Sequence, residues 1–219
     1  MEPAIYTQST FDFFHNLREN NNRTWWLAHK DQYDGFVAAP TKAIMQDLEV
    51  QYGPGHFFRA NRDIRFSHDK SPYKLNASFS IGGPAGTGMY FEVSSNGIFV
   101  GGGMYEPRPD QLQRWRELFN KPKVVAEIKK FLKSSEEMGL TLSHEMEVKT
   151  APRGWDKAHP EIDFIRLKNA VIGVSFDPDF AKDANALNKQ IHEVAKRVAA
   201  WNQLIDRHVG GSTMPGREY

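Results

Sequence analysis

The sequence predicts an α+β fold in which an antiparallel β-meander sheet packs against several helices and a long helix ends the chain. Three observations predict it. The first fifty residues place apolar side chains at helical spacing, residues 57–103 change to a period of two, and the residues after 109 return largely to helical spacing. Of the 219 residues, 40% are hydrophobic and 12% are aromatic, which is enough for a substantial buried core.

Helices are expected at the start of the chain. Ser9 and Thr10 are candidate N-caps of a first helix, which the asparagine run 20–22 ends. A second helical stretch follows. Pro40 interrupts or restarts it, because proline lacks the amide hydrogen that a helix interior needs, and the Gly-Pro-Gly segment 53–55 stops it.

Strands are expected next. Residues 62–66 alternate between polar and apolar, and residues 73–81 do the same after a turn. Two further strands, 89–94 and 98–103, flank an Asn-Gly pair at 96–97. Such a pair is typical of a two-residue hairpin turn, because both central residues of a type I′ turn need positive φ. We therefore expect an antiparallel meander.

Helices and strands are both expected after residue 108. The patterns predict helices at Pro109 and after Pro122, a strand at 140–148, a short helix that begins at Pro160 and a buried strand at 170–176.

A long final helix is expected after the last strand. Asp177 or Asp179 would cap it, and its apolar positions continue as far as Leu204. The sequence contains no internal repeat, linker or low-complexity segment. We therefore expect a single domain over residues 1–209, followed by a flexible tail over residues 210–219.

Composition excludes several classes of site and partner. Cysteine is absent, so disulfides, thiolate metal ligands and thiol nucleophiles are ruled out. The 8 histidines lack metal-binding spacing, and no metal site is predicted. The 28 basic and 27 acidic residues give a net charge of +1, which counts against a nucleic-acid partner. Neither a signal peptide nor a membrane span is recognised, so a cytoplasmic protein with no membrane association is expected.

The most unusual segment is the charged string 59–74. It holds five Lys or Arg and two Asp, a local net charge of +3 (5 − 2). Guanidinium and ammonium groups suit phosphate or carboxylate oxygens, so the string predicts a site for an anion. Its candidate ligand-binding residues are Arg62, Arg65, Lys70, Tyr73 and Lys74.

The alternation places part of this string on one face of the sheet. If 62–66 is a strand, Asp63 and Arg65 point the same way, and Lys74 and Asn76 join them from the next strand. A carboxylate among these cations could orient them or act as a general base, which makes Asp63 and Asp69 the catalytic candidates. The alternative is that the charges form ion pairs with a purely structural role.

The string Arg62–Lys74, RDIRFSHDKSPYK, closely resembles the central signature of a family catalogued as a domain of unknown function, DUF2461. Further matching stretches are NNRTWW at 21–26, GMYEP at 103–107 continuing through Arg116, and PRGW at 152–155 followed by His159-Pro160. Lys168 stands where the family tends to carry Leu-x-Lys. The resemblance spans roughly residues 10 to 208. It implies an α+β fold and a set of motif positions, and it implies no established reaction.

The remaining candidate ligand-binding residues come from these other stretches. Arg153 and His159 belong to a loop that is expected to enter a helix, where the helix N-terminus would help them attract an anion. In the alternative interpretation, this loop only places Trp155 as a lid on the core. Tyr105, Arg116 and Lys168 complete the candidates through their positions in the matching stretches.

Three hypotheses for function follow, in order of preference. The first is a site for a small anionic ligand, bearing phosphate or carboxylate, with or without catalysis. The second is a non-catalytic protein-interaction domain in which the string forms a buried ion-pair network. The third is a nucleic-acid-binding module with Tyr73, Tyr90 and Phe99 as stacking groups. No cofactor, reaction or oligomeric state is predicted.

Overall fold

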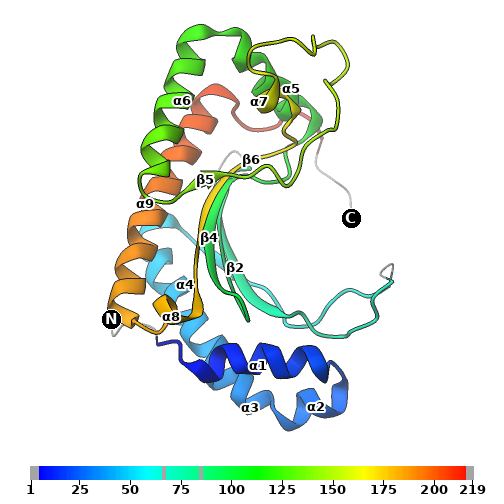
Figure 1. The fold of residues 1–219 in the computed structure, drawn as a ribbon, viewed down its shortest axis with the longest axis vertical. Helices are drawn as coiled ribbons and strands as arrows, with labels where there is room; N and C mark the ends of the chain where they lie inside the picture. Colours follow the sequence, from blue (N-terminus) through cyan, green and yellow to red (C-terminus); the bar gives the residue numbers. More distant parts are fainter. Residues whose placement is uncertain (1–4, 66–67, 84–85, 216–219) are drawn as a thin grey trace. The chain divides into compact units, whose positions relative to one another are not determined.

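The structure, a computed structural model, describes residues 5–65, 68–83 and 86–215. Phe66, the last residue of the strand predicted at 62–66, therefore lies outside the described residues, as does Ser67 of the charged string. The predicted α+β class is confirmed (Figure 1). The described residues form an antiparallel six-stranded sheet in the order β1-β2-β3-β4-β6-β5, packed with helices, and a long C-terminal helix.

The elements have the following bounds. In chain order they are α1 (Gln8–Glu19), α2 (Arg23–Ala28), α3 (Lys30–Gln32), the π-helical segment η1 (Tyr33–Ala38), α4 (Ala39–Tyr52), β1 (Gly55–Phe57), β2 (Asn76–Gly82), β3 (Gly88–Ser94), β4 (Gly97–Met104), α5 (Pro109–Glu117), the 3₁₀ segment η2 (Leu118–Asn120), α6 (Pro122–Glu136), β5 (Thr141–Leu142), α7 (Ile162–Arg166), β6 (Ala170–Phe176), α8 (Pro178–Ala181) and α9 (Ala184–His208). In the described part of the chain, no helix has the length and hydrophobicity that crossing a membrane requires.

The chain forms two compact units. Unit 1 comprises Met1–Ile81, Tyr90–Val100 and Ser175–Ala195, and unit 2 comprises Gly82–Met89, Gly101–Val174 and Lys196–Tyr219. The divisions fall inside β2, β3, β4, β6 and α9, so each unit contains part of the sheet and part of the last helix.

The helices predicted for the first fifty residues are present in unit 1, but α1 starts earlier than predicted. Its N-cap is Thr7, whose amide donates to Thr10 Oγ1 at 3.2 Å, rather than Ser9 or Thr10. Thr10 is fully buried inside the helix. The asparagine run does end α1, and Asn22 then caps α2 by accepting the amide of the third helical residue.

Pro40 restarts the helix, which was one of the two predicted outcomes. It is the second residue of α4, directly after the π-helical segment η1. In a regular helix its amide would bond the carbonyl oxygen of Phe36, four residues earlier, and proline has no such amide. That oxygen accepts a hydrogen bond from Thr10 Oγ1 at 2.8 Å instead.

The strands of unit 1 have one buried face. β1 pairs antiparallel with β2, with Phe57 opposite Phe79, and the rings of Phe79 and Phe91 stack at 5.0 Å between centroids. Figure 1 shows α4 and α9 on one side of β2 to β4, and these two helices bury apolar residues of their own. The buried apolar residues of this layer include Ile44, Leu48, Ala77, Phe79, Ile81, Phe91, Val93, Ile98, Val100, Leu187 and Ile191.

The hairpin between β3 and β4 turns one residue earlier than predicted. Its turn residues are Ser95 and Asn96, whereas Gly97 already belongs to β4. Of these, only Gly97 has a positive φ, at 111°. A Cβ on Gly97 would lie 2.1 Å from the carbonyl oxygen of Phe176. The glycine therefore serves the close approach of β6, and the predicted Asn-Gly turn is wrong.

In unit 2, the helices predicted at Pro109 and after Pro122 are α5 and α6, and each begins with its proline. Trp115 of α5 and Trp201 of α9 are fully buried and meet edge to face at 6.1 Å. Trp201 Nε1 donates to the carbonyl oxygen of Ala170 at 2.9 Å, which joins the last helix to β6.

The strand predicted at 140–148 is much shorter. β5 contains only Thr141–Leu142, and an isolated bridge joins Glu147 to Leu167 further on. Between them, the amide of Glu145 donates to Ser143 Oγ at 3.4 Å. A serine that bonds the backbone two residues ahead favours a turn over a strand, and it interrupts the predicted element here.

The predicted long final helix is divided into α8 and α9. Asp177 caps α8 by accepting the amide of Phe180 at 2.8 Å. Asp183 accepts the amide of Ala186 at 3.0 Å, at the start of α9. Two aspartates that each begin a helix explain why the helix is not continuous. Asp179, the other predicted cap, pairs with Lys182 instead.

The first residues of the predicted tail contact α5 within unit 2. Asp110 accepts hydrogen bonds from Ser212 Oγ at 2.7 Å and from the amide of Thr213 at 2.8 Å. Arg114 donates to the carbonyl oxygens of Val209 and Gly211, both at 2.7 Å. These bonds place residues 209–213 along the N-terminal half of the helix.

Candidate functional site

The charged string forms a loop between β1 and β2 in unit 1. Backbone bonds close its base: the amide of Arg62 donates to the carbonyl oxygen of Pro72 at 2.9 Å, and that of Lys74 to Ala60 at 2.8 Å. Beyond this base the described residues do not continue a strand. The predicted strand at 62–66 is therefore wrong.

Aspartate side chains explain the missing strand. The amide of Arg65 donates to Asp63 Oδ1 at 3.2 Å, and the amide of Ser71 donates to Asp69 Oδ1 at 2.9 Å. An aspartate that bonds the backbone two residues ahead imitates a turn and competes with strand pairing. Consequently, Asp63 and Arg65 do not share a sheet face with Lys74.

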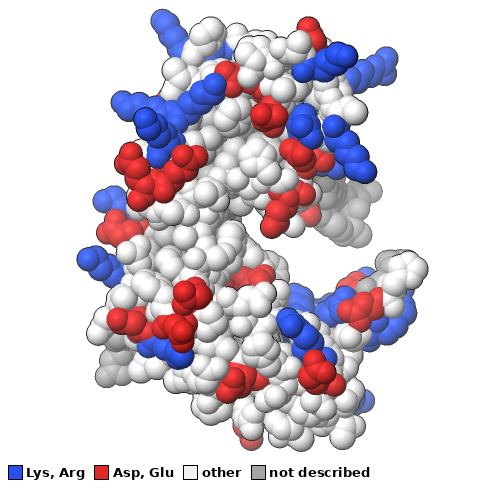
Figure 2. Space-filling model, viewed as in Figure 1, with Lys and Arg blue, Asp and Glu red and all other residues white. Residues whose placement is uncertain are grey.

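Ion pairs occupy the described part of the loop, where Figure 2 shows blue and red side chains intermingled at the lower right. Arg62 pairs with Asp69. Arg65 holds Asp63 with two nitrogens, since Nη2 lies 2.7 Å from Oδ2 and Nε lies 3.0 Å from Oδ1. The Arg65 side chain is 77% exposed, so these pairs are not the buried network of the second hypothesis.

The same pairs make both catalytic candidates weak bases. The hydrogen bond from Arg65 lowers the pKa of Asp63 to about 2. The hydrogen bond from Arg62 lowers the pKa of Asp69 below its usual range. A carboxylate with so low a pKa accepts a proton poorly near neutral pH, which counts against a general-base role for either residue.

Two other candidates of the string stabilise the local fold. Lys70 Nζ donates to the carbonyl oxygen of Ile64 at 3.0 Å, across the loop. Tyr73 is buried, and its ring stacks on Trp26 at 4.1 Å. The side chain of Asn21 bonds both the amide and the carbonyl of Tyr73. These contacts place Tyr73 in the core rather than on a binding surface.

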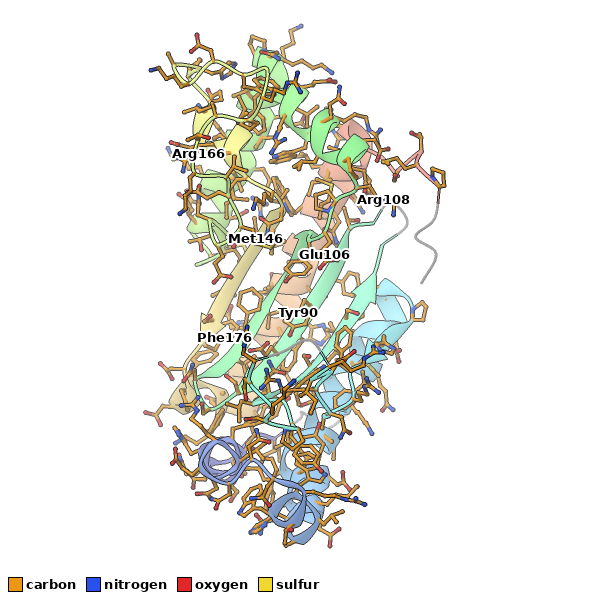
Figure 3. The ribbon with its side chains drawn as sticks, turned by 90° about the vertical axis from the view of Figure 1, so that its right-hand side faces the viewer. Tyr90, Glu106, Arg108, Met146, Arg166 and Phe176 are labelled. Carbon is orange, nitrogen blue, oxygen red and sulfur yellow. The ribbon has the colours of Figure 1, made fainter. Side chains whose placement is uncertain are left out.

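Lys74 and Asn76 do lie on the sheet face that unit 1 leaves without a described helix. Figure 3 looks onto this face, with Tyr90 of β3 on it. Asn76 Nδ2 donates to Glu92 Oε2 at 3.0 Å, and Tyr90 Oη donates to the same oxygen at 2.8 Å. Lys74 Nζ lies 5.3 Å from the ring centroid of Phe58, and the Phe58 and Tyr90 centroids are 6.5 Å apart. We call these five residues and the neighbouring Arg59 the Lys74 site.

The charged form of Lys74 is disfavoured by its surroundings, whereas Arg62 and Arg65 in the loop are paired with aspartates. Burial, and then the positive charge of Arg59, lower the pKa of Lys74. Its Nζ makes neither a hydrogen bond nor an ion pair with any described residue, and the same is true of the exposed Arg59 guanidinium. Two cations therefore lie near each other, and neither makes an ion pair with a described carboxylate. The hydrogen bond from Arg65 and, more weakly, the charge of Arg59 lower the pKa of Asp63.

The candidates in unit 2 are dispersed. Arg116 Nε donates to the carbonyl oxygen of Ile165 at 2.9 Å, and burial lowers the Arg116 pKa. The backbone amide of Lys168 donates to Met146 at 2.8 Å, whereas the Lys168 side chain is exposed. Tyr105 is 60% exposed. No contact between described side chains joins any of these candidates to another.

The loop predicted to enter a helix does so later than expected, because α7 begins two residues after Pro160. His159 Nδ1 accepts the amide of Glu161 at 3.0 Å, and its ring meets Trp155 edge to face at 5.7 Å. This histidine therefore shapes the turn. Arg153 is exposed. Among the described residues, no three His, Asp or Glu side chains come together in a way that could hold a metal ion.

A sequence model of the DUF2461 family, described as a conserved hypothetical protein, matches residues 9–204. The chain belongs to the DUF2461 family. The match includes the charged string and the other stretches on which the resemblance was based, so the predicted family is confirmed. A comparison with curated proteins finds no match.

Two of the family stretches meet in this DUF2461 chain. Asn21 and Trp26 belong to the first stretch and Tyr73 to the central one, and their contacts attach the base of the charged loop to the N-terminal helices. The most recognisable residues of the central stretch thus include a structural one, Tyr73, which was predicted to bind ligand.

The sequence analysis missed three residues of the Lys74 site in this DUF2461 chain, Phe58, Arg59 and Glu92, and it named Tyr90 only as a stacking group for nucleic acid. Strand alternation did place Tyr90 and Glu92 on the face opposite Phe91, and it placed Asn76 on the polar face of the preceding strand. Pairing those two faces would have brought Glu92 next to Asn76. No sequence signal indicated that Arg59 would lie near Lys74.

Proposed function

We propose that this DUF2461 protein binds a small anionic ligand, bearing a phosphate or a carboxylate, at the Lys74 site. The observation that carries the proposal is the proximity of Arg59 and Lys74, neither of which makes an ion pair with a described carboxylate. An anion bound between them would offset their mutual repulsion and the cost of burying the ammonium group. Arginine adds a forked pair of donors that matches phosphate and carboxylate oxygens.

Other cations of the string are less suitable for this role. Arg62 and Arg65 are already engaged by Asp69 and Asp63, and Lys70 is bonded to a backbone carbonyl. An incoming anion would have to displace those partners. At Arg59 and Lys74 no ion pair with a described residue would have to be broken, and the nearby Asp63 interacts with Arg59 only through its charge.

Neighbouring groups on the sheet face favour a ligand that carries a hydrogen-bond donor and some apolar surface in addition to its anionic group. Glu92 Oε2 accepts hydrogen bonds from both Asn76 and Tyr90, so Oε1 is the oxygen still open to a ligand donor. The rings of Phe58 and Tyr90 supply apolar surface beside the cations. A ligand with an anionic group at one end and a hydroxyl or amino group at the other would contact both the cations and Glu92 Oε1.

A thermal-shift experiment tests the proposal with a matched control. Lys42 Nζ lies 5.1 Å from the ring centroid of Phe57, so it repeats the Lys74–Phe58 arrangement at an exposed position on α4. Phosphate, pyrophosphate, sugar phosphates and dicarboxylates are added to the wild type, Lys74→Met and Lys42→Met. At least one of them should raise the melting temperature of the wild type and Lys42→Met but not of Lys74→Met. Equal stabilisation of all three proteins, or of none, contradicts the proposal.

A further inference from the structure

We infer that Lys74 is an amine nucleophile that forms an imine with an anion carrying an aldehyde or ketone group. The inference rests on the proposed anion site and extends it, because it names the chemical class of the ligand and a covalent step. The supporting features are the position of the Lys74 Nζ, the neighbouring Arg59 and the polar groups on the same sheet face.

The surroundings of Lys74 favour its uncharged form. Its side chain is half-buried, and its Nζ makes no ion pair with a described residue. Burial and the charge of Arg59 lower the Lys74 pKa. A lysine becomes a nucleophile when it is desolvated or lies beside another cation, and Lys74 is partly desolvated and lies near Arg59. The Phe58 ring opposes this by attracting the ammonium, but 5.3 Å is near the outer limit of such contacts.

Arg59 supplies the second requirement, a cation that persists when Lys74 loses its proton. A guanidinium stays charged at any pH at which proteins are folded, whereas an ammonium does not. Arg59 can therefore hold the carboxylate or phosphate of the ligand while the neutral Lys74 amine attacks its carbonyl carbon. In this arrangement the two cations have different roles.

The covalent step balances without a further reactant. The Nζ lone pair forms a C–N bond while the carbonyl π pair moves to oxygen, which gains a proton as nitrogen loses one. The carbinolamine then loses that oxygen as water, together with the second proton of nitrogen, and a C=N bond remains. Glu92 lies on the same sheet face, and none of the hydrogen bonds to it from described residues uses Oε1, which makes Glu92 a candidate for assisting these transfers.

Reductive trapping tests the inference, with glyoxylate as the probe and borohydride as the reductant. Hydride reduces the imine to a stable secondary amine, so the modified lysine carries a carboxymethyl group that peptide mass spectrometry locates. In the wild type and Lys42→Arg, initial labelling of Lys74 should exceed labelling of other lysines by about tenfold, because a lowered pKa leaves a larger fraction of this amine uncharged. Oxalate, which has the charge but no reactive carbonyl, should suppress it.

Lys74→Arg separates the inference from the proposed function, because it keeps a cation and removes the nucleophile. It should still be stabilised by the ligands that stabilise the wild type, while selective labelling disappears. If those ligands stabilise both proteins but Lys74 is labelled no faster than Lys42, the imine is overturned and the anion site stands. If neither stabilisation nor selective labelling occurs, both are overturned. Labelling that is equally fast with the neutral probe propanal contradicts the anchoring role of Arg59.

Discussion

The side chain of Asn21 makes both main-chain hydrogen bonds of Tyr73. Asn21 Nδ2 donates to the Tyr73 carbonyl oxygen at 2.9 Å, and the Tyr73 amide donates to Asn21 Oδ1 at 3.1 Å. The amide side chain of Asn21 thus supplies the two hydrogen bonds that a neighbouring strand would make, at the point where the charged loop returns to the sheet. Because Tyr73 directly precedes Lys74, this clamp also positions the proposed nucleophile.

Asn21→Ala should destabilise the protein by about 1–3 kcal/mol, because it leaves a part-buried amide and carbonyl without partners. Urea unfolding monitored by tryptophan fluorescence measures the change. Asn20→Ala is the matched control, since Asn20 is exposed and its side chain only bonds the carbonyl of Asn16. A loss for Asn21→Ala no larger than for Asn20→Ala would mean that the clamp does not hold the loop.

Tyr73→Ala should cost about 3–5 kcal/mol, because it removes a buried ring that stacks on Trp26. Tyr105→Ala should change the free energy of unfolding by less than about 0.5 kcal/mol, since Tyr105 is 60% exposed. Both tyrosines were predicted to bind ligand, so the comparison separates a structural residue from a surface one. A small effect of Tyr73→Ala would restore it as a ligand-binding candidate.

The pairing of Asp63 with Arg65 predicts an unusual titration. The Asp63 pKa should be about 2 in the wild type and rise toward the usual range in Arg65→Ala. A depressed carboxyl pKa contributes stability above the unfolded pKa, and this contribution is lost as pH falls through the folded pKa near 2. Carbon-detected NMR of the aspartate carboxyls follows the titration. An ordinary Asp63 pKa in the wild type would show that the pair is not maintained in solution.

Much of the fold could be predicted because its signals are local. The period of two in β2 and β3 depends on residues such as Phe79 and Phe91, which face the core. The prolines that begin α5 and α6 are equally local signals. The prediction of a strand at 62–66 was wrong for a reason that is also local. The side chains of Asp63 and Asp69 bond nearby backbone amides and so compete with strand pairing, which the alternation of polar and apolar residues does not reveal.

The Lys74 site was only partly predictable because it depends on contacts distant in sequence. Lys74 was selected from the charged string, and Asn76 was added by strand alternation. Glu92 reaches Asn76 only when β2 and β3 pair, and Arg59 approaches Lys74 only because the backbone of Ala60 accepts the Lys74 amide. Composition and spacing record neither pairing. Arg62 and Arg65, two of the cations that pointed to an anion site in the sequence, instead form ion pairs with Asp69 and Asp63.

Asp206 in unit 2 predicts a pH dependence of stability opposite in sign to that of Asp63. Burial raises its pKa, and the hydrogen bond from Thr87 Oγ1 at 3.1 Å only partly offsets this. The folded state therefore binds a proton more tightly than the unfolded state. Its relative stability is greatest below the unfolded pKa and declines as pH rises through the folded pKa. Asp206→Asn, whose amide oxygen can still accept from Thr87, should raise the melting temperature at pH 7 and lose that advantage at pH 3.

The exposed Asp31→Asn should show no such pH dependence. If Asp206→Asn melts lower than the wild type at pH 7, the carboxylate is stabilising and its burial is not the dominant influence.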